Sequence, residues 1–160
     1  MANKSVCINC KRDLPNAEFN SGTNNSVKYQ RSSCKRCQSN QRNVAKSVSP
    51  YTYISQIFHK LKSSRTKQGM EWEIDISHLQ SLWDAQEGRC ALSGVFMTWQ
   101  AGEGKQEFNV SIDRKDSNKA YIIGNIQLVT QRVNIMKHTL GDSELYWWCK
   151  NVVQKKENAD

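Results

Sequence analysis

The clearest pattern of hydrophobic and polar positions lies between Phe108 and Leu140. From Phe108 to Ile112 the two kinds of residue alternate, which predicts a strand with one buried face, and a polar loop follows. Apolar residues at 126–129 predict a second short strand, and Thr130 is placed to cap a helix that Gly141 ends. This stretch therefore predicts a compact unit of strand, loop, strand and helix.

The chain before this unit shows helical spacing twice. A helix is predicted to open at Pro50 and to end before Gly69, because the apolar residues between them recur at intervals of three and four. Alternation from Trp72 to Ile76 then predicts a short strand. Ser77 is placed to cap a second helix that runs to about Gln86.

Less regular stretches separate these elements. The polar residues from Gln38 to Ser49 are interpreted as a linker or as the tail of a short helix, and Gln100 to Gln106 as a flexible connection. After Gly141, either Asp142 or Ser143 is placed to cap a last helix. The apolar stripe of that helix consists of Leu145, Trp148, Cys149, Val152 and Val153.

Charge is distributed unevenly along this chain of net charge +8. Residues 1–69 contain 13 Lys/Arg and 2 Asp/Glu, whereas residues 70–160 contain 10 and 13. The first part is therefore the better candidate for binding phosphates, although a solvated basic face is the plainer alternative. The sequence has no run long enough to span a membrane and no apolar leader, so we expect no membrane partner and a cytoplasmic location in a bacterium or a phage-infected cell.

Two Cys-x-x-Cys pairs, Cys7 with Cys10 and Cys34 with Cys37, flank a polar insert. Together the pairs can offer four thiolates to one Zn²⁺, which would be structural because no coordination position stays open. Such an ion would hold together a segment that cannot form a core of its own. Free thiols or a redox pair are the alternatives. The surrounding cations are predicted to contact DNA: Lys11, Arg12, Lys28, Arg31, Lys35, Arg36 and Arg42.

Two further cysteines have no cysteine nearby in the sequence. Cys90 and Cys149 are interpreted as small core residues, and a second zinc site completed by a histidine is the alternative.

Several residue types between positions 111 and 137 follow an order found in a known family. They are S-I-D-R ending at Arg114, then Tyr121, then Gly124-Asn125, then N-x-x-K at Asn134 to Lys137, with a looser match upstream at Gly88 to Gly94. The combined pattern resembles the HNH (ββα-metal) nucleases. It is most similar to the branch in which Asp-Arg replaces the usual Asp-His, a branch that includes a restriction enzyme. The close resemblance covers about a quarter of the chain.

The resemblance implies a site for a divalent ion such as Mg²⁺ between Asp113 and Asn134, whose oxygens are ligands that hard cations prefer. Arg114 cannot accept a proton near neutral pH, so it does not replace the histidine that activates water in most of the family. The resemblance instead points to Tyr121 as base or nucleophile and to Arg114 as a ligand of the scissile phosphate. Simple packing of Tyr121 beside its isoleucine neighbours is the alternative.

Three other residues complete the candidate set. Asn125 corresponds to the asparagine that ties the ends of the family's loop together through backbone hydrogen bonds. Related sites include a histidine, so His59, one position off the apolar stripe of its helix, is a candidate, with a surface or boundary position as the alternative. His78 lies in the first turn of a predicted helix and is interpreted as an exposed residue or a neutral base.

These observations predict an α+β protein with a ββα-metal core at about 108–140, flanking helices and an N-terminal zinc module. The predicted domains are 1–48 and 49–160. The expected function is a metal-dependent endonuclease that cuts double-stranded DNA, of the homing or restriction type, with structural Zn²⁺ and catalytic Mg²⁺. A non-catalytic zinc protein that binds nucleic acid, or a nuclease for RNA or for particular DNA structures, are the alternatives. A homodimer is an open option.

Overall fold

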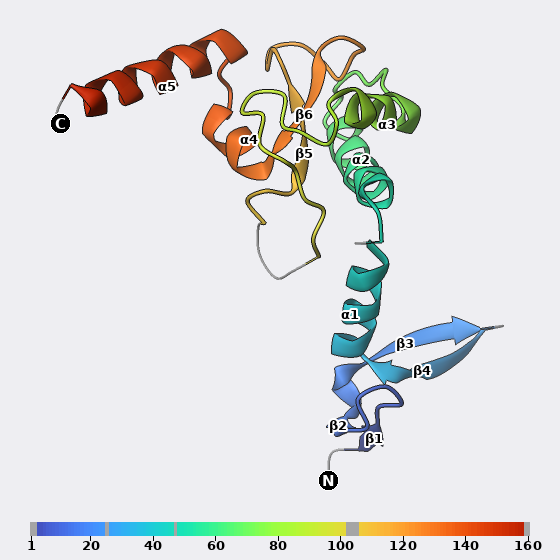
Figure 1. The fold of residues 1–160 in the computed structure, drawn as a ribbon. Helices are drawn as coiled ribbons and strands as arrows, with labels where there is room; N and C mark the ends of the chain where they lie inside the picture. Colours follow the sequence, from blue (N-terminus) through green and yellow to red (C-terminus); the bar gives the residue numbers. More distant parts are fainter. Residues whose placement is uncertain (1–2, 25, 47, 102–105, 159–160) are drawn as a thin grey trace. The chain divides into compact units, whose positions relative to one another are not determined.

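The computed structural model describes residues 3–24, 26–46, 48–101 and 106–158. It divides into two compact units, Met1–Lys46 and Ser47–Asp160, which we describe separately. Within the described residues, five α-helices accompany three two-stranded antiparallel sheets (Figure 1). The predicted mixture of helices and small sheets is therefore confirmed.

The first unit consists of two small hairpins and a helix. Its elements are β1 (Lys4–Val6), β2 (Asp13–Pro15), a short 3-10 helix (Asn16–Glu18), β3 (Phe19–Asn24), β4 (Val27–Cys34) and α1 (Lys35–Lys46). β1 pairs with β2 and β3 with β4. Only Cys7, Phe19 and Cys34 form a buried cluster among the described residues of this unit. A core this small gives little hydrophobic stabilisation.

Helix α1 occupies most of the stretch for which a linker or the tail of a short helix was predicted. It has 12 residues and starts directly after Cys34, so Cys37 lies in its first turn. The helical alternative is therefore the correct one, and the second cysteine pair joins a strand to a helix.

The second unit carries the predicted hairpin and helix. Its elements are α2 (Pro50–Thr66), α3 (Ile76–Ala85), β5 (Val110–Arg114), β6 (Ile126–Thr130), α4 (Gln131–Lys137) and α5 (Asp142–Glu157). β5 and β6 pair with Ile112 opposite Leu128. As predicted, Thr130 caps α4, because its hydroxyl accepts a hydrogen bond from the backbone N–H of Val133. The start of α2 at Pro50 is likewise confirmed.

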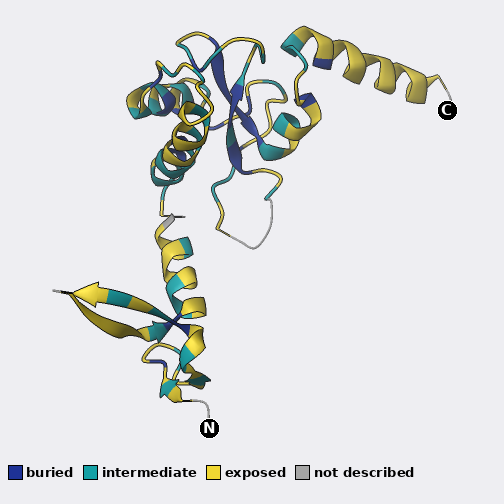
Figure 2. Ribbon diagram, turned by 180° about the vertical axis from the view of Figure 1, so that it is seen from behind, coloured by how far each residue is buried: buried dark blue, intermediate teal, exposed yellow. Residues whose placement is uncertain are grey.

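A hydrophobic core holds this unit together and fixes the hairpin. Figure 2 shows β5 and β6 largely in the buried colour, and every residue of β6 is buried. The buried members of the core are Ile54, Phe58, Ile74, Leu79, Trp83, Cys90, Met97, Val110, Ile112, Tyr121, Ile126, Leu128 and Val129. Each large side chain removed from water in this way contributes roughly 1.5–3 kcal/mol.

Helix boundaries differ from the predictions at three places. α4 ends at Lys137 because His138 takes a positive φ of 50°, which breaks the helix before Gly141. Asp75, and not Ser77, caps α3 by accepting hydrogen bonds from the His78 N–H and the Ser77 hydroxyl. Gly141 precedes α5, where its N–H donates to the Glu144 carboxylate at 2.8 Å, so neither Asp142 nor Ser143 is the cap.

Two other expectations are wrong. The segment from Trp72 to Ile76 is no strand, since it makes only an isolated bridge between Trp72 and Tyr121, and its alternation reflects side chains that anchor it in the core. Cys90 is a core residue as predicted, but Cys149 is exposed on α5. The connection predicted for Gln100 to Gln106 falls largely on 102–105, which lie outside the described residues.

None of the helices in the described ranges is both long and apolar enough to cross a membrane.

Candidate functional site

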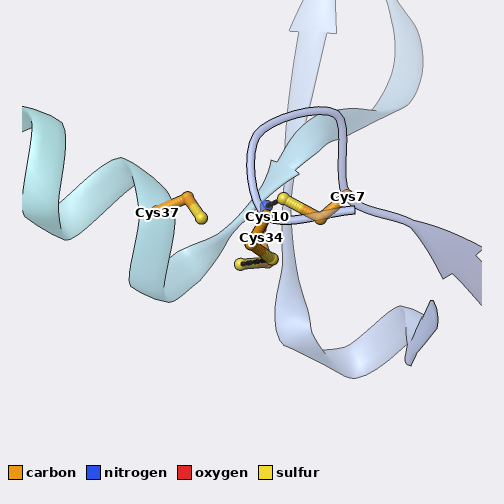
Figure 3. A group of neighbouring side chains, drawn as sticks. All are labelled: Cys7, Cys10, Cys34 and Cys37. Carbon is orange, nitrogen blue, oxygen red and sulfur yellow. Dashed lines mark hydrogen bonds between the residues drawn. The ribbon is translucent and has the colours of Figure 1, made fainter. Parts of the chain in front are cut away.

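Four cysteines of the first unit form a candidate metal centre. Cys7 and Cys10 lie on the loop after β1, Cys34 ends β4, and Cys37 lies in the first turn of α1. Their side chains point toward a common centre (Figure 3), and the four sulfur atoms lie within 4.8 Å of one another. Four sulfurs bound to one zinc at about 2.3 Å would be only slightly closer together. The four cysteines could therefore hold a metal such as zinc.

The acid–base chemistry of these thiols suits a cation. Backbone N–H groups of Cys10 and Cys34 donate to the Cys7 sulfur and lower its pKa to about 6. The side chain of Arg12 donates to the Cys10 sulfur and lowers that pKa as well. The hydrogen bond with Cys34 raises the pKa of Cys37 to about 12. A divalent cation would supply the charge that the last thiol needs in order to ionise.

The seven cations predicted to contact DNA are all exposed in the first unit. Arg31 and Arg42 line one polar pocket together with amide side chains such as Gln38 and Gln41. Lys35 donates to the backbone carbonyl of Ala17, and Arg12 is engaged with Cys10 as described above. The structure thus brings two of the seven cations, both arginines, to one pocket.

A pocket of about 370 Å³ in the second unit collects most of the residues that the sequence singled out. Asp113 and Arg114 reach it from the end of β5, Asn134 from α4 and Tyr121 from the loop between the strands. Residues of α2 form another wall: Tyr53, Ile57, Lys60, Leu61, Ser64 and Arg65. Strand, loop and helix therefore converge on one site.

Asp113 is held in a buried polar network. Its carboxylate forms an ion pair with Lys137 at 3.0 Å and accepts a hydrogen bond from Gln127 at 2.9 Å. The Lys137 side chain has no solvent exposure and that of Asp113 only 5%. Asp142 joins the network through Gln127 and Lys137. The carboxylate that was predicted to bind a metal ion is thus already oriented by the ammonium group of Lys137.

In the sequence, Lys137 stood out only as the end of the N-x-x-K pattern, and nothing drew attention to Gln127. Two signals could have found them. Lys137 follows Asn134 by three positions, so the two share one face of α4. Gln127 stands directly opposite Asp113 in the antiparallel pair, where side chains on one face meet.

Arg114 and Tyr121 lie side by side. The guanidinium carbon is 5.2 Å from the centre of the Tyr121 ring, and the group donates to the Lys119 carbonyl at 2.8 Å. The Tyr121 ring also stacks on Trp72, at 4.5 Å between centroids. Only 4% of Tyr121 is exposed. The ring is thus packed in the core and at the same time lines the pocket.

The two asparagines have different surroundings. Asn125 accepts from the Asp116 N–H and donates to the carbonyls of Asp116 and Ala120, so its side chain connects distant parts of the loop between β5 and β6. The amide nitrogen of Asn134 donates to the Ser111 hydroxyl at 2.7 Å. That bond fixes the Asn134 side chain against β5 through its amide nitrogen. The amide oxygen takes no part in the bond.

The histidine that lines the pocket is one that the sequence did not single out. His138 follows α4 directly and contributes to the pocket wall. His59 is exposed, its ring packs edge-on against Phe58, and the structure does not bring it to the pocket. His78 is half-buried on α3, also outside the lining. The position of His138 just after N-x-x-K was the available signal.

Comparisons with known proteins return little. No family model matches the sequence, and no curated protein matches it either. One solved structure, that of the rare-cutting HNH restriction endonuclease PacI, is similar to this chain over 97% of both chains, with 16% sequence identity and a TM-score of 0.45. A likeness this low carries no weight for function, so the function proposed below rests on the residues and contacts described above.

Proposed function

We propose that this protein is a metal-dependent endonuclease that hydrolyses phosphodiester bonds in double-stranded DNA. One observation carries the proposal. Asp113, Arg114, Tyr121 and Asn134, the residues that the HNH resemblance singles out in the sequence, line one pocket on the β5, β6 and α4 unit. Together they offer oxygen ligands for a cation, a guanidinium for a phosphate and a phenol at one pocket, which is the combination that phosphodiester hydrolysis uses.

The charges around the pocket suit an anionic substrate. Lys60 and Arg65 of α2 and Arg114 of β5 line it, against the single carboxylate of Asp113, which is already paired with Lys137. The Nε atom of Arg65 is buried and has no hydrogen-bond partner in the described part of the chain. A phosphate oxygen is the kind of acceptor that such a guanidinium binds.

Asp113 and Asn134 would hold the divalent ion. A carboxylate offers about four lone-pair positions, so Asp113 can keep its bonds to Lys137 and Gln127 and still contribute an oxygen to an ion. When bound, the ion supplies positive charge for the phosphate and the leaving oxygen. Lys137 and Gln127 are positioning residues that fix the carboxylate.

The remaining groups bind the phosphate and accept the proton. Arg114 presents its planar fork at the pocket and binds the scissile phosphate. Tyr121 is the proton acceptor or nucleophile implied by the resemblance, and the imidazole of His138 on the pocket wall is the alternative base.

A non-catalytic protein that binds nucleic acid is the second candidate. The exposed cations of the first unit favour it, because phosphate binding needs no chemistry. A nuclease for RNA or for particular DNA structures would use the same pocket, and it differs only in the substrate that is cut.

Cleavage of supercoiled plasmid by the zinc-loaded protein, with and without Mg²⁺, tests the proposal. We expect cutting only with Mg²⁺, and loss of cutting in Asp113→Asn with DNA binding retained. Asp142→Asn is the matched control, because Asp142 belongs to the same ion-pair network but does not line the pocket. Cutting by Asp113→Asn at the wild-type rate, or an equal loss in both variants, would reject the proposed site.

A further inference from the structure

Helix α5 carries an apolar face that its own unit covers only near one end. Leu145, in its second turn, is buried, with 9% of its surface exposed. Along the same face, 55% of Trp148, 67% of Val152 and 53% of Val153 are exposed. Figure 2 shows nearly the whole helix in the exposed colour. A contiguous apolar stripe of this kind marks an interaction surface.

The stripe borders an apolar groove. Met136 of α4 and Leu140 line it together with four residues of α5: Leu145, Trp148, Val152 and Val153. The remaining lining residue is Cys149, so none of the lining side chains carries a charge. The groove is therefore suited to an apolar helix and not to a phosphate.

We propose that two copies of this chain associate through their α5 helices, which pair antiparallel so that each stripe enters the groove of the other copy. The charges at the two ends of α5 favour a second α5 helix, in the antiparallel orientation, as the partner. The first turn contains Asp142 and Glu144, and the last turn contains Lys155 and Lys156. Antiparallel pairing sets the acidic end of each helix beside the basic end of its partner, and it also opposes the two helix dipoles.

The flanks of the stripe match in the same arrangement. Glu144 and Lys155 are about three turns apart on the helix, so they lie on one flank. When two identical helices pair antiparallel about a twofold axis, each flank meets the same flank of its copy. Glu144 then faces Lys155 of the other copy twice, whereas a parallel pair would set the two acidic first turns at the same level.

The antiparallel pairing would place Cys149 close to the twofold axis. The midpoint of α5, which spans Asp142–Glu157, falls between Cys149 and Lys150. A twofold axis at that midpoint brings the exposed Cys149 within about one turn of Cys149 of the second copy. The association needs neither DNA nor Mg²⁺, so its outcome is independent of the proposed nuclease activity.

Sedimentation equilibrium of the zinc-loaded full chain tests the proposal. We expect a reversible monomer–dimer equilibrium that Val152→Glu weakens by about tenfold or more, because it places a charge in the apolar contact. Gln154→Glu is the matched control, since it makes the same change in charge half a turn away from Val152, on the exposed opposite side of α5. A wild-type protein that stays monomeric at every attainable concentration overturns the proposal, whatever else the helix then binds. Equal weakening by the two variants overturns it as well.

Cross-linking determines the direction of the pairing. In a Cys149→Ser background, a mixture of Glu144→Cys and Lys155→Cys proteins should form the mixed disulfide on mild oxidation, while each variant alone should not dimerise covalently. Failure of this mixture to form the mixed disulfide, while the dimer itself is present, would contradict the antiparallel arrangement.

Discussion

In the first unit, four cysteines provide the candidate metal site and also most of the buried cluster, whereas in the second unit the candidate site lies on a core of hydrophobic side chains. The cysteines come as two close pairs, and they hold each other through hydrogen bonds such as that from the Cys34 N–H to the Cys7 sulfur. Asp113 and Asn134 come from β5 and α4, and both elements contribute side chains to one hydrophobic core. The candidate metal site is thus part of the core in the first unit, whereas in the second unit it lies beside a separate hydrophobic core.

Removal of zinc should give the largest effect and should separate the two units. A strong chelator is expected to unfold the first unit because zinc binding contributes on the order of 10 kcal/mol to folding in modules of this size. The second unit should keep its structure. Two-dimensional NMR of the chelated protein would show this as collapse of one set of amide signals while the other set stays dispersed.

Cysteine variants sharpen that result. Cys34→Ser should reproduce the collapse of the first unit, whereas Cys149→Ser, which changes an exposed thiol, should not. Metal analysis that finds no zinc in the purified wild-type protein would contradict the assignment.

Loss of Lys137 should strongly destabilise the second unit alone. Lys137→Met leaves the carboxylate of Asp113 buried without its ion-pair partner, which costs about 3–5 kcal/mol in comparable sites. Lys119→Met is the control, because the Lys119 pair with Asp116 is exposed and should contribute less than about 1 kcal/mol. Urea denaturation followed by tryptophan fluorescence measures both, and equal shifts in the two variants would refute the role given to the buried pair.

Tyr121→Phe should slow cleavage without unfolding the site. The ring and its stacking on Trp72 are kept, and loss of the hydroxyl should cost about 10²-fold in rate if it accepts the proton. Single-turnover cleavage measures the loss, and binding of uncut DNA in Ca²⁺ should barely change. If Tyr121→Phe cuts normally while His138→Ala does not, the proton acceptor is His138.

The sequence predicted those features that depend on residues close together in the chain. The paired cysteines, the alternation in β5 and the cap at Thr130 are local features, and the structure contains all three. It did not predict the buried pair of Lys137 and Asp113, because a lysine in an apolar helix pattern is ordinarily placed in solvent and its partner lies on another element.

The two wrong expectations near the site have a similar cause. Alternation from Trp72 to Ile76 is shared by strands and by extended segments that anchor side chains, and only a paired neighbour distinguishes them. The helix after Thr130 was predicted to include His138, because a histidine gives no signal in the sequence that its φ will be positive. Both features are set by tertiary contacts.

The Mg²⁺ dependence of single-turnover cleavage tests most directly whether Asp113 and Asn134 hold the catalytic ion. Asn134→Asp adds a charged oxygen ligand, and its second oxygen can accept a hydrogen bond from the Ser111 hydroxyl in place of the bond that the Asn134 amide now donates to that hydroxyl. Half-maximal cleavage should therefore need less Mg²⁺ than in the wild type. Asn134→Ala removes the ligand and should need more. Identical Mg²⁺ dependence in all three proteins would contradict the proposed metal site.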